Sequence, residues 1–200
     1  MPAAVVLTFE GLRDAEQILS FHNGGFGGGG SGPGPGFGIT FGVFSFTGID
    51  SDAGGGNIAN EPSPSTVASF LQGLPGGAVM NVAAGFTGAS SFFYTSSQAG
   101  NMTVWDAVGG AVGGGGLLAT IGIRANAFGS CPGDPTGSFA CWNPSGSSAA
   151  SARSDCFRRH YSGQPHTWYS RTSRLRPASH SGEKMKNRLS MMFRQQCRTP

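Results

Sequence analysis

The sequence predicts an antiparallel β-sandwich, and three observations lead to this prediction. Four short apolar or alternating runs lie in one block, at residues 78–83, 90–95, 101–106 and 117–123. Clusters of Gly, Ser or Asn bound each run, and the runs begin about a dozen residues apart, which is typical of sandwiches and barrels. The 35 glycines and 12 prolines follow no collagen period, so we interpret them as turns between strands.

The chain before this block supplies further elements. Residues 5–9 are rich in β-branched side chains and predict a first strand, and residues 14–21 predict one or two helical turns. Residues 37–49 alternate as a long strand or a hairpin does, and residues 66–74 predict one more strand. The glycine-rich stretch 23–36 contains a dinucleotide-type glycine spacing, but no strand leads into it and no helix follows. We therefore expect a flexible surface loop and no phosphate site there.

Charge divides the chain into two unlike parts. Residues 1–140 hold two basic and eight acidic residues, a net charge of −6, whereas residues 141–200 have a net charge of +9. We therefore predict a β-sandwich domain at residues 4–144 and a disordered basic tail at residues 145–200. No run of 18 apolar residues occurs, so we expect no membrane span.

Cys131 and Cys141 stand ten residues apart around Pro-Gly-Asp-Pro turns. No second cysteine pair stands at zinc-ligand spacing, so the two are predicted to form a disulfide in an oxidising compartment. Such a bond would contribute about 2 to 3 kcal/mol. Free thiols in a cytoplasmic protein are the alternative.

Three acidic or aromatic positions are candidate binding residues. Asp50 and Asp52 begin a run that resembles a calcium loop, but Gly54 stands where a third oxygen ligand belongs. Solvated turn carboxylates and a bound cation are the two alternatives for this pair. Trp105 is expected to pack in the core, and stacking on a carbohydrate is its alternative.

The sequence contains no catalytic constellation. His22 is the only histidine in the first 140 residues, and no Ser-His-Asp arrangement or nucleophile elbow is present. The sequence therefore predicts a protein that is not an enzyme.

Several segments resemble secreted bacterial proteins of the PEP-CTERM sorting class: VLTFEGL at 6–12, IDSDAGG at 49–55, NEPSPSTV at 60–67, MNVA at 80–83, GDPTG at 133–137 and CWNP at 141–144. The resemblance covers roughly residues 4–144. It implies a jelly-roll-like sandwich, a cleaved export signal, and a place outside or on the surface of a Gram-negative cell that produces extracellular polysaccharide. The expected function is non-enzymatic, with polysaccharide as the partner and glycan binding as its specific form. In jelly-roll carbohydrate modules a glutamate near the first strand commonly binds a structural calcium, and by analogy Glu10 is a candidate ligand.

The chain departs from that class at both ends. An export signal is missing before residue 4, and the Val-Pro-Glu-Pro sorting tag is missing from the tail. Residues 155–164, read in another frame, permit Ile-Ala-Phe-Asp-Asp-Ile-Thr-Val-Gly-Ser, which is similar to the closing strand of the relatives. Our hypothesis is a frameshift between Pro144 and Asp155. The alternative takes the tail as genuine, an unstructured arm that binds nucleic acid through its eleven basic residues.

Overall fold

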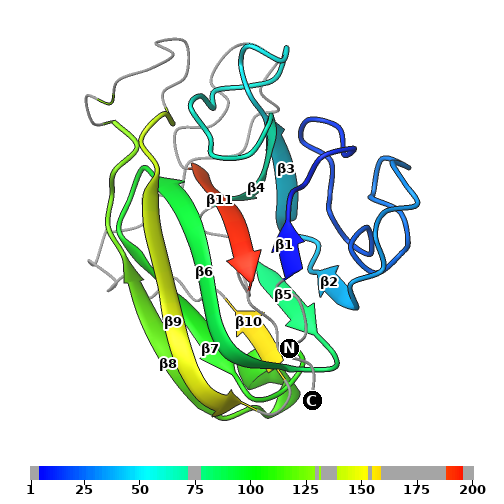
Figure 1. Ribbon diagram of the computed structural model, residues 1–200, viewed down its shortest axis with the longest axis vertical. Helices are drawn as coiled ribbons and strands as arrows, with labels where there is room; N and C mark the ends of the chain where they lie inside the picture. The colour runs from blue at the N-terminus through cyan, green and yellow to red at the C-terminus, as the bar shows by residue number, and fades with distance from the viewer. Residues whose placement is uncertain are drawn as a thin grey trace, which may run out of the picture.

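The computed structural model describes residues 5–71, 78–128, 131, 139–152, 155–158 and 188–195. These residues form an antiparallel β-sandwich of two layers (Figure 1), as the sequence predicts. The elements are β1 (Val5–Leu7), β2 (Ile39–Phe41), β3 (Ser45–Ile49), β4 (Thr66–Leu71), β5 (Val79–Val82), β6 (Phe86–Ser96), β7 (Gly100–Trp105), the 3-10 turn η1 (Gly110–Gly113), β8 (Leu117–Ile123), β9 (Asn143–Ala152), β10 (Asp155–Arg158) and β11 (Arg188–Gln195).

Most strands occur where alternation predicts them. The four runs of the central block become β5, β6, β7 and β8, and the stretch 37–49 becomes β2 and β3 with a turn between them. The helical turns expected at residues 14–21 do not form. Ala15 and Leu19 adopt left-handed φ values of 59° and 45°, which break any helix, and the segment runs as successive turns.

The two sheets are assembled from the chain in the same way. One sheet has the order β3-β4-β11-β6-β9, with β1 also paired to β11, and the other has the order β2-β5-β10-β7-β8. In each sheet the middle strand therefore comes from the C-terminal part of the chain. Figure 1 shows β11 beside β6 in the front layer, and β10 with β7 and β8 behind them.

Residues 145–200 were expected to be a disordered tail, and three strands lie wholly or partly within them. Residues 145–152 continue β9, and β10 and β11 fill positions that the earlier strands leave open. Backbone pairing explains why these segments form strands. β11 lies between β4 and β6, and β10 lies between β5 and β7, so each satisfies the backbone hydrogen bonds of two neighbours. The other residues of this segment lie outside the described residues.

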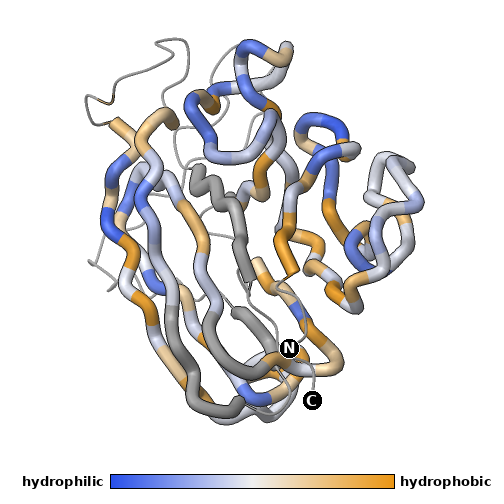
Figure 2. The backbone as a smooth tube through the Cα atoms, in the orientation of Figure 1, coloured by the Kyte–Doolittle hydropathy of each residue, from blue (hydrophilic) through white to orange (hydrophobic). Residues whose placement is uncertain are grey.

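The main core lies between the sheets. It is built from aliphatic and aromatic side chains that alternate inward along the strands, together with residues of the N-terminal turns. In Figure 2 the apolar colour falls mainly on the strands and on the chain entering the N-terminal loops, whereas loop tips are pale or blue. A smaller cluster of Ile58, Val67, Ala127 and Phe139, with Trp142 against it, closes one end.

Candidate functional site

The outer face of the five-stranded sheet carries the candidate binding residue Trp105. Along β7, Met102 and Val104 are buried in the core, so the alternating Thr103 and Trp105 lie on the opposite face. Trp105 is half-buried there. The expectation that it packs in the core is therefore wrong, because its neighbour Val104 takes the inward position.

A hydrogen bond fixes the indole of Trp105 against this face. Its Nε1 donates to Thr103 Oγ1 across 2.9 Å, within the same strand and on the same side of the sheet. Thr103 is only 7% exposed although it faces outward. The indole therefore keeps its N–H satisfied while the side chain stays partly exposed on the outer face.

The segment between β7 and β8 borders this aromatic surface. Asp106 Oδ1 accepts a 2.6 Å hydrogen bond from Gly116 N, which closes the base of the segment. The backbone N–H of Gly109 donates to Asn81 Oδ1 of β5 across 3.1 Å, so the segment reaches over β10 toward β5. Apolar side chains are exposed along it and at the start of β8: Val108, Val112, Leu117 and Leu118. Trp105 thus lies at the edge of a mixed polar and apolar surface.

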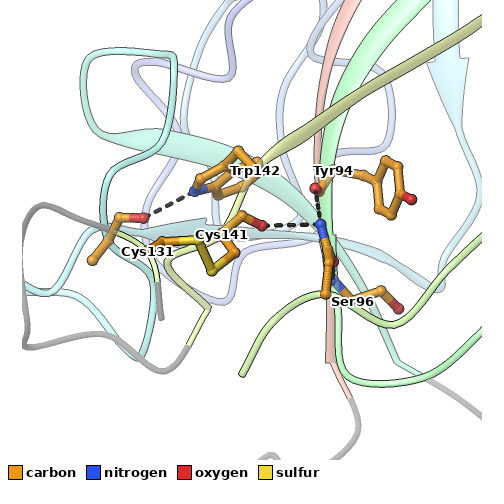
Figure 3. The surroundings of a disulfide bond; sticks show 7 residues. Tyr94, Ser96, Cys131, Cys141 and Trp142 are labelled. Atoms are coloured by element: carbon orange, nitrogen blue, oxygen red, sulfur yellow. Dashed lines mark hydrogen bonds between the residues drawn. A yellow bond between two sulfur atoms is a disulfide. The ribbon is translucent and has the colours of Figure 1, made fainter. Parts of the chain in front are cut away.

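The predicted disulfide is present. Cys131 and Cys141 are bonded, with their Cα atoms 5.5 Å apart, and Cys141 is buried (Figure 3). Next to it, Trp142 Nε1 donates to the carbonyl oxygen of Ala59 across 2.9 Å. The bond and the indole together attach the start of β9 to the small core cluster at this end of the sandwich.

Asn126 organises the same corner and was not identified from the sequence. Its side-chain amide donates to the carbonyl oxygens of Tyr94 and Cys141, at 3.0 and 3.1 Å. Its Oδ1 accepts from Ser96 N at 2.7 Å. One side chain therefore joins the end of β6 to the disulfide. An isolated asparagine in a loop has no sequence signal that would predict this role.

Of the candidate metal ligands Glu10, Asp50 and Asp52, the carboxylates of Glu10 and Asp50 accept hydrogen bonds from the chain itself. The carboxylate of Glu10 accepts four hydrogen bonds, from the backbone N–H and hydroxyl groups of Ser65 and Thr66, at 2.8 to 3.1 Å. Asp50 Oδ1 accepts from Asp52 N at 2.7 Å in a tight turn. No three His, Cys, Asp or Glu side chains in the described part of the chain are grouped so as to hold a metal ion.

Glu61 is a further carboxyl group near Glu10 and Asp50 that the sequence did not single out. Both of its carboxylate oxygens are buried and have no hydrogen-bond partner among the described residues. Burial raises the pKa of Glu61 to about 7, and the neighbouring carboxyl groups of Asp50 and Glu10 add to the rise. The group therefore changes its charge near neutral pH.

Glu16 anchors the glycine-rich loop, which is ordered where a flexible loop was expected. Its carboxylate accepts from the backbone N–H of Arg13, Gly29 and Ser31 and from Ser31 Oγ, at 2.6 to 3.0 Å. Burial acts to raise the pKa of Glu16, but these hydrogen bonds outweigh it and hold the pKa at about 2. Because the amides of Gly29 and Ser31 already bind this carboxylate, they are not available to a phosphate.

Comparisons with known proteins identify no family. No protein-family profile and no curated protein matches the chain. The K3 cleaved adhesin domain of Lys-gingipain from Porphyromonas gingivalis W83 is similar at 12% identity and a TM-score of 0.36, covering 76% of this chain and 90% of that one. The K1 cleaved adhesin domain of the same protein is similar at 12% identity and a TM-score of 0.35, covering 78% and 98%. Among the described residues, no helix has the length and apolar character needed to cross a membrane.

Proposed function

We propose that the protein is a non-enzymatic, glycan-binding protein of the bacterial cell surface or extracellular space, of the PEP-CTERM exopolysaccharide-associated class. The placement of Trp105 carries the glycan-binding part of the proposal. An indole held against an outer sheet face, with its N–H already bonded to Thr103, offers a fixed apolar surface to the apolar face of a sugar ring.

The disulfide supports the compartment. Cys131 and Cys141 form a disulfide. Disulfides form and persist in oxidising surroundings, which are found outside the cytoplasm. The bond ends at Cys141, and the next residue, Trp142, packs against the small core cluster and donates to the carbonyl oxygen of Ala59, so the oxidised state fits the folded structure. Export and folding are thus expected to be linked.

The test is binding of the full, oxidised chain to a panel of extracellular polysaccharides and oligosaccharides. We expect W105A to weaken binding by about tenfold or more, as for a central aromatic anchor, and W105F to retain part of it. Phe128, which is 68% exposed and lies after β8, provides the matched control, because F128A removes an exposed aromatic ring elsewhere. The bound glycan is expected to be recovered uncleaved.

Two results would contradict the proposal. If W105A and F128A bind every glycan as the unmodified chain does, the outer face is not the binding surface. If binding is instead found to nucleic acid, and falls steeply as salt is raised, the basic residues after residue 144 are the functional part of the chain.

A further inference from the structure

His22 is enclosed by four phenylalanine rings at the N-terminal side of the core. Its imidazole is 2% exposed. The ring centroids of Phe9 and Phe21 lie 5.0 and 5.3 Å away in edge-to-face contact, and that of Phe41 lies 5.9 Å away. Phe37 is nearly parallel to the imidazole, with centroids 6.2 Å apart. We call these four rings the aromatic cage.

Neither nitrogen of His22 has a hydrogen-bond partner among the described residues. A neutral imidazole in this position leaves one N–H and one acceptor unsatisfied, which is already costly in an apolar site. A protonated imidazole would leave two N–H donors and a full charge without an acceptor or a counter-ion. The closed cage therefore accommodates the neutral form and excludes the charged one.

Phe37 is the most exposed wall of the cage. Phe9, Phe21 and Phe41 are at most 5% exposed, whereas Phe37 is 42% exposed. Phe37 stands between Gly36 and Gly38, and an added Cβ at either glycine would meet nothing within 4 Å. The backbone N–H of Phe37 donates to the carbonyl oxygen of His22 at 2.8 Å and, at the longer distance of 3.2 Å, to that of Pro35. Glycine has no Cβ, so a change of backbone angles on either side of Phe37 meets fewer steric limits than it would at other residues.

We propose that His22 and Phe37 form an acid-operated latch, in which protonation of the imidazole displaces the Phe37 ring and loosens the glycine-rich loop 23–38. Displacement of Phe37 brings water to the imidazole, so the charged form gains solvation that the closed cage denies it. The loop would loosen with it because Phe37 lies near the end of the loop and is bonded to His22 there.

The charged groups on the elements around the cage are bound to partners other than His22. Residues 8–22 carry Glu10, Arg13, Asp14 and Glu16, while loop 23–38 and β2 carry no titratable side chain. Glu10 is bound to Ser65 and Thr66, Asp14 to the N–H of Ile49, and Arg13 to the carbonyl oxygen of Gly29. Glu16, the other anchor of the loop, has its pKa held at about 2 and stays ionised through mildly acidic pH.

The sign and size of the effect follow from burial. Burial lowers the pKa of His22 from 6.5 to about 4. The stability of the closed state relative to the open state is complete above pH 6.5. It decreases as the pH falls toward 4, because the open state binds the proton more tightly. With these two pKa values, the ratio of open to closed molecules rises about eightfold as the pH falls from 7 to 5.5.

Amide hydrogen exchange on the full, oxidised chain tests the latch. After correction for the intrinsic pH dependence of exchange, protection at the bonded amides of Gly28, Gly34 and Phe37 should fall about eightfold from pH 7 to pH 5.5. The β7–β8 ladder should keep its protection and serves as the internal control. H22L, which removes the titrating group but fills a similar volume, should abolish the pH dependence in the loop.

A second variant and a direct titration guard against a folding failure of H22L. F37A opens the cage permanently, so His22 should titrate near 6.5 in it, as measured by NMR of the imidazole, while it titrates near 4 in the unmodified chain. The proposal is overturned if His22 of the unmodified chain titrates near 6.5. It is also overturned if loop protection falls equally in H22L and the unmodified chain.

Discussion

Glu16 and Glu61 show that burial alone does not set the charge of a carboxyl group in this sandwich. Four hydrogen bonds hold Glu16 ionised with a pKa of about 2. Glu61 has buried oxygens without a described donor, and its pKa rises to about 7. Hydrogen-bond donors outweigh burial at Glu16, whereas burial and the neighbouring carboxyl groups prevail at Glu61.

The first prediction concerns Glu61. A raised folded-state pKa means that its stabilising contribution is complete below pH 4.5 and is lost as the pH rises through 7. E61Q should therefore match the unmodified chain at pH 4 and exceed it at pH 8. After allowance for partial exposure, we expect a difference of about 1 to 2 kcal/mol at pH 8. Urea unfolding at the two pH values measures it.

Glu16 supplies the matched control for this experiment. E16Q makes the same chemical change but replaces an acceptor of four hydrogen bonds, so the free energy of unfolding should fall at both pH values. Equal stability of E61Q and the unmodified chain at pH 8 would show that Glu61 is ionised without cost, and that the orphaned oxygens find donors in solution.

At the scale of elements, the glycine-rich loop owes its order to close backbone approaches. A Cβ added at Gly34 would lie 2.4 Å from the carbonyl oxygen of Phe21 and 2.7 Å from its ring. At Gly36, two residues later in the same loop, it would meet nothing within 4 Å, and the φ there is not left-handed. The glycines thus divide into those that packing requires and those that it does not.

The second prediction follows from this division. G34A should lower the free energy of unfolding by about 1 to 3 kcal/mol, because the backbone of Phe21 cannot move aside without disturbing the core. G36A should leave the free energy of unfolding unchanged or raise it by up to about 1 kcal/mol, because alanine lowers the conformational entropy of the unfolded chain. Thermal unfolding of the two variants compares them directly, and equal losses would show that loop flexibility, and not contact with Phe21, is what alanine removes.

At the scale of the whole molecule, the limits of sequence-based prediction have a physical cause. Strands β5 to β8 were predictable because alternation between Gly, Ser and Asn clusters is a local signal. The inward position of Val104, which turns Trp105 outward, depends on how β7 packs, and either register fits the same local pattern. The roles of Glu61 and Asn126 depend on residues in other segments of the chain, so their own sequence neighbours do not predict them.

The C-terminal strands were missed for the same reason. The segments of β10 and β11 lack a strong alternating pattern, and what defines them is a place between strands that are already formed. β11 pairs with four residues of β4, with seven of β6 and with three of β1. The pairing of β1 and the middle of this sheet therefore depend on residues near the C-terminus of the chain.

The third prediction tests this dependence by truncation. A chain ending at Asn187 lacks β11, so β1 loses its partner and the pairs β3-β4 and β6-β9 are no longer joined. We expect it to lose cooperative unfolding and to aggregate through the exposed strand edges, since the lost pairing approaches the whole stability of an ordinary domain, about 5 to 15 kcal/mol. A chain ending at Gln195 keeps every described strand and should unfold as the full chain does. If the chain ending at Asn187 also unfolds cooperatively at the same denaturant concentration, the sandwich closes without β11, which is what a frameshifted, dispensable tail requires.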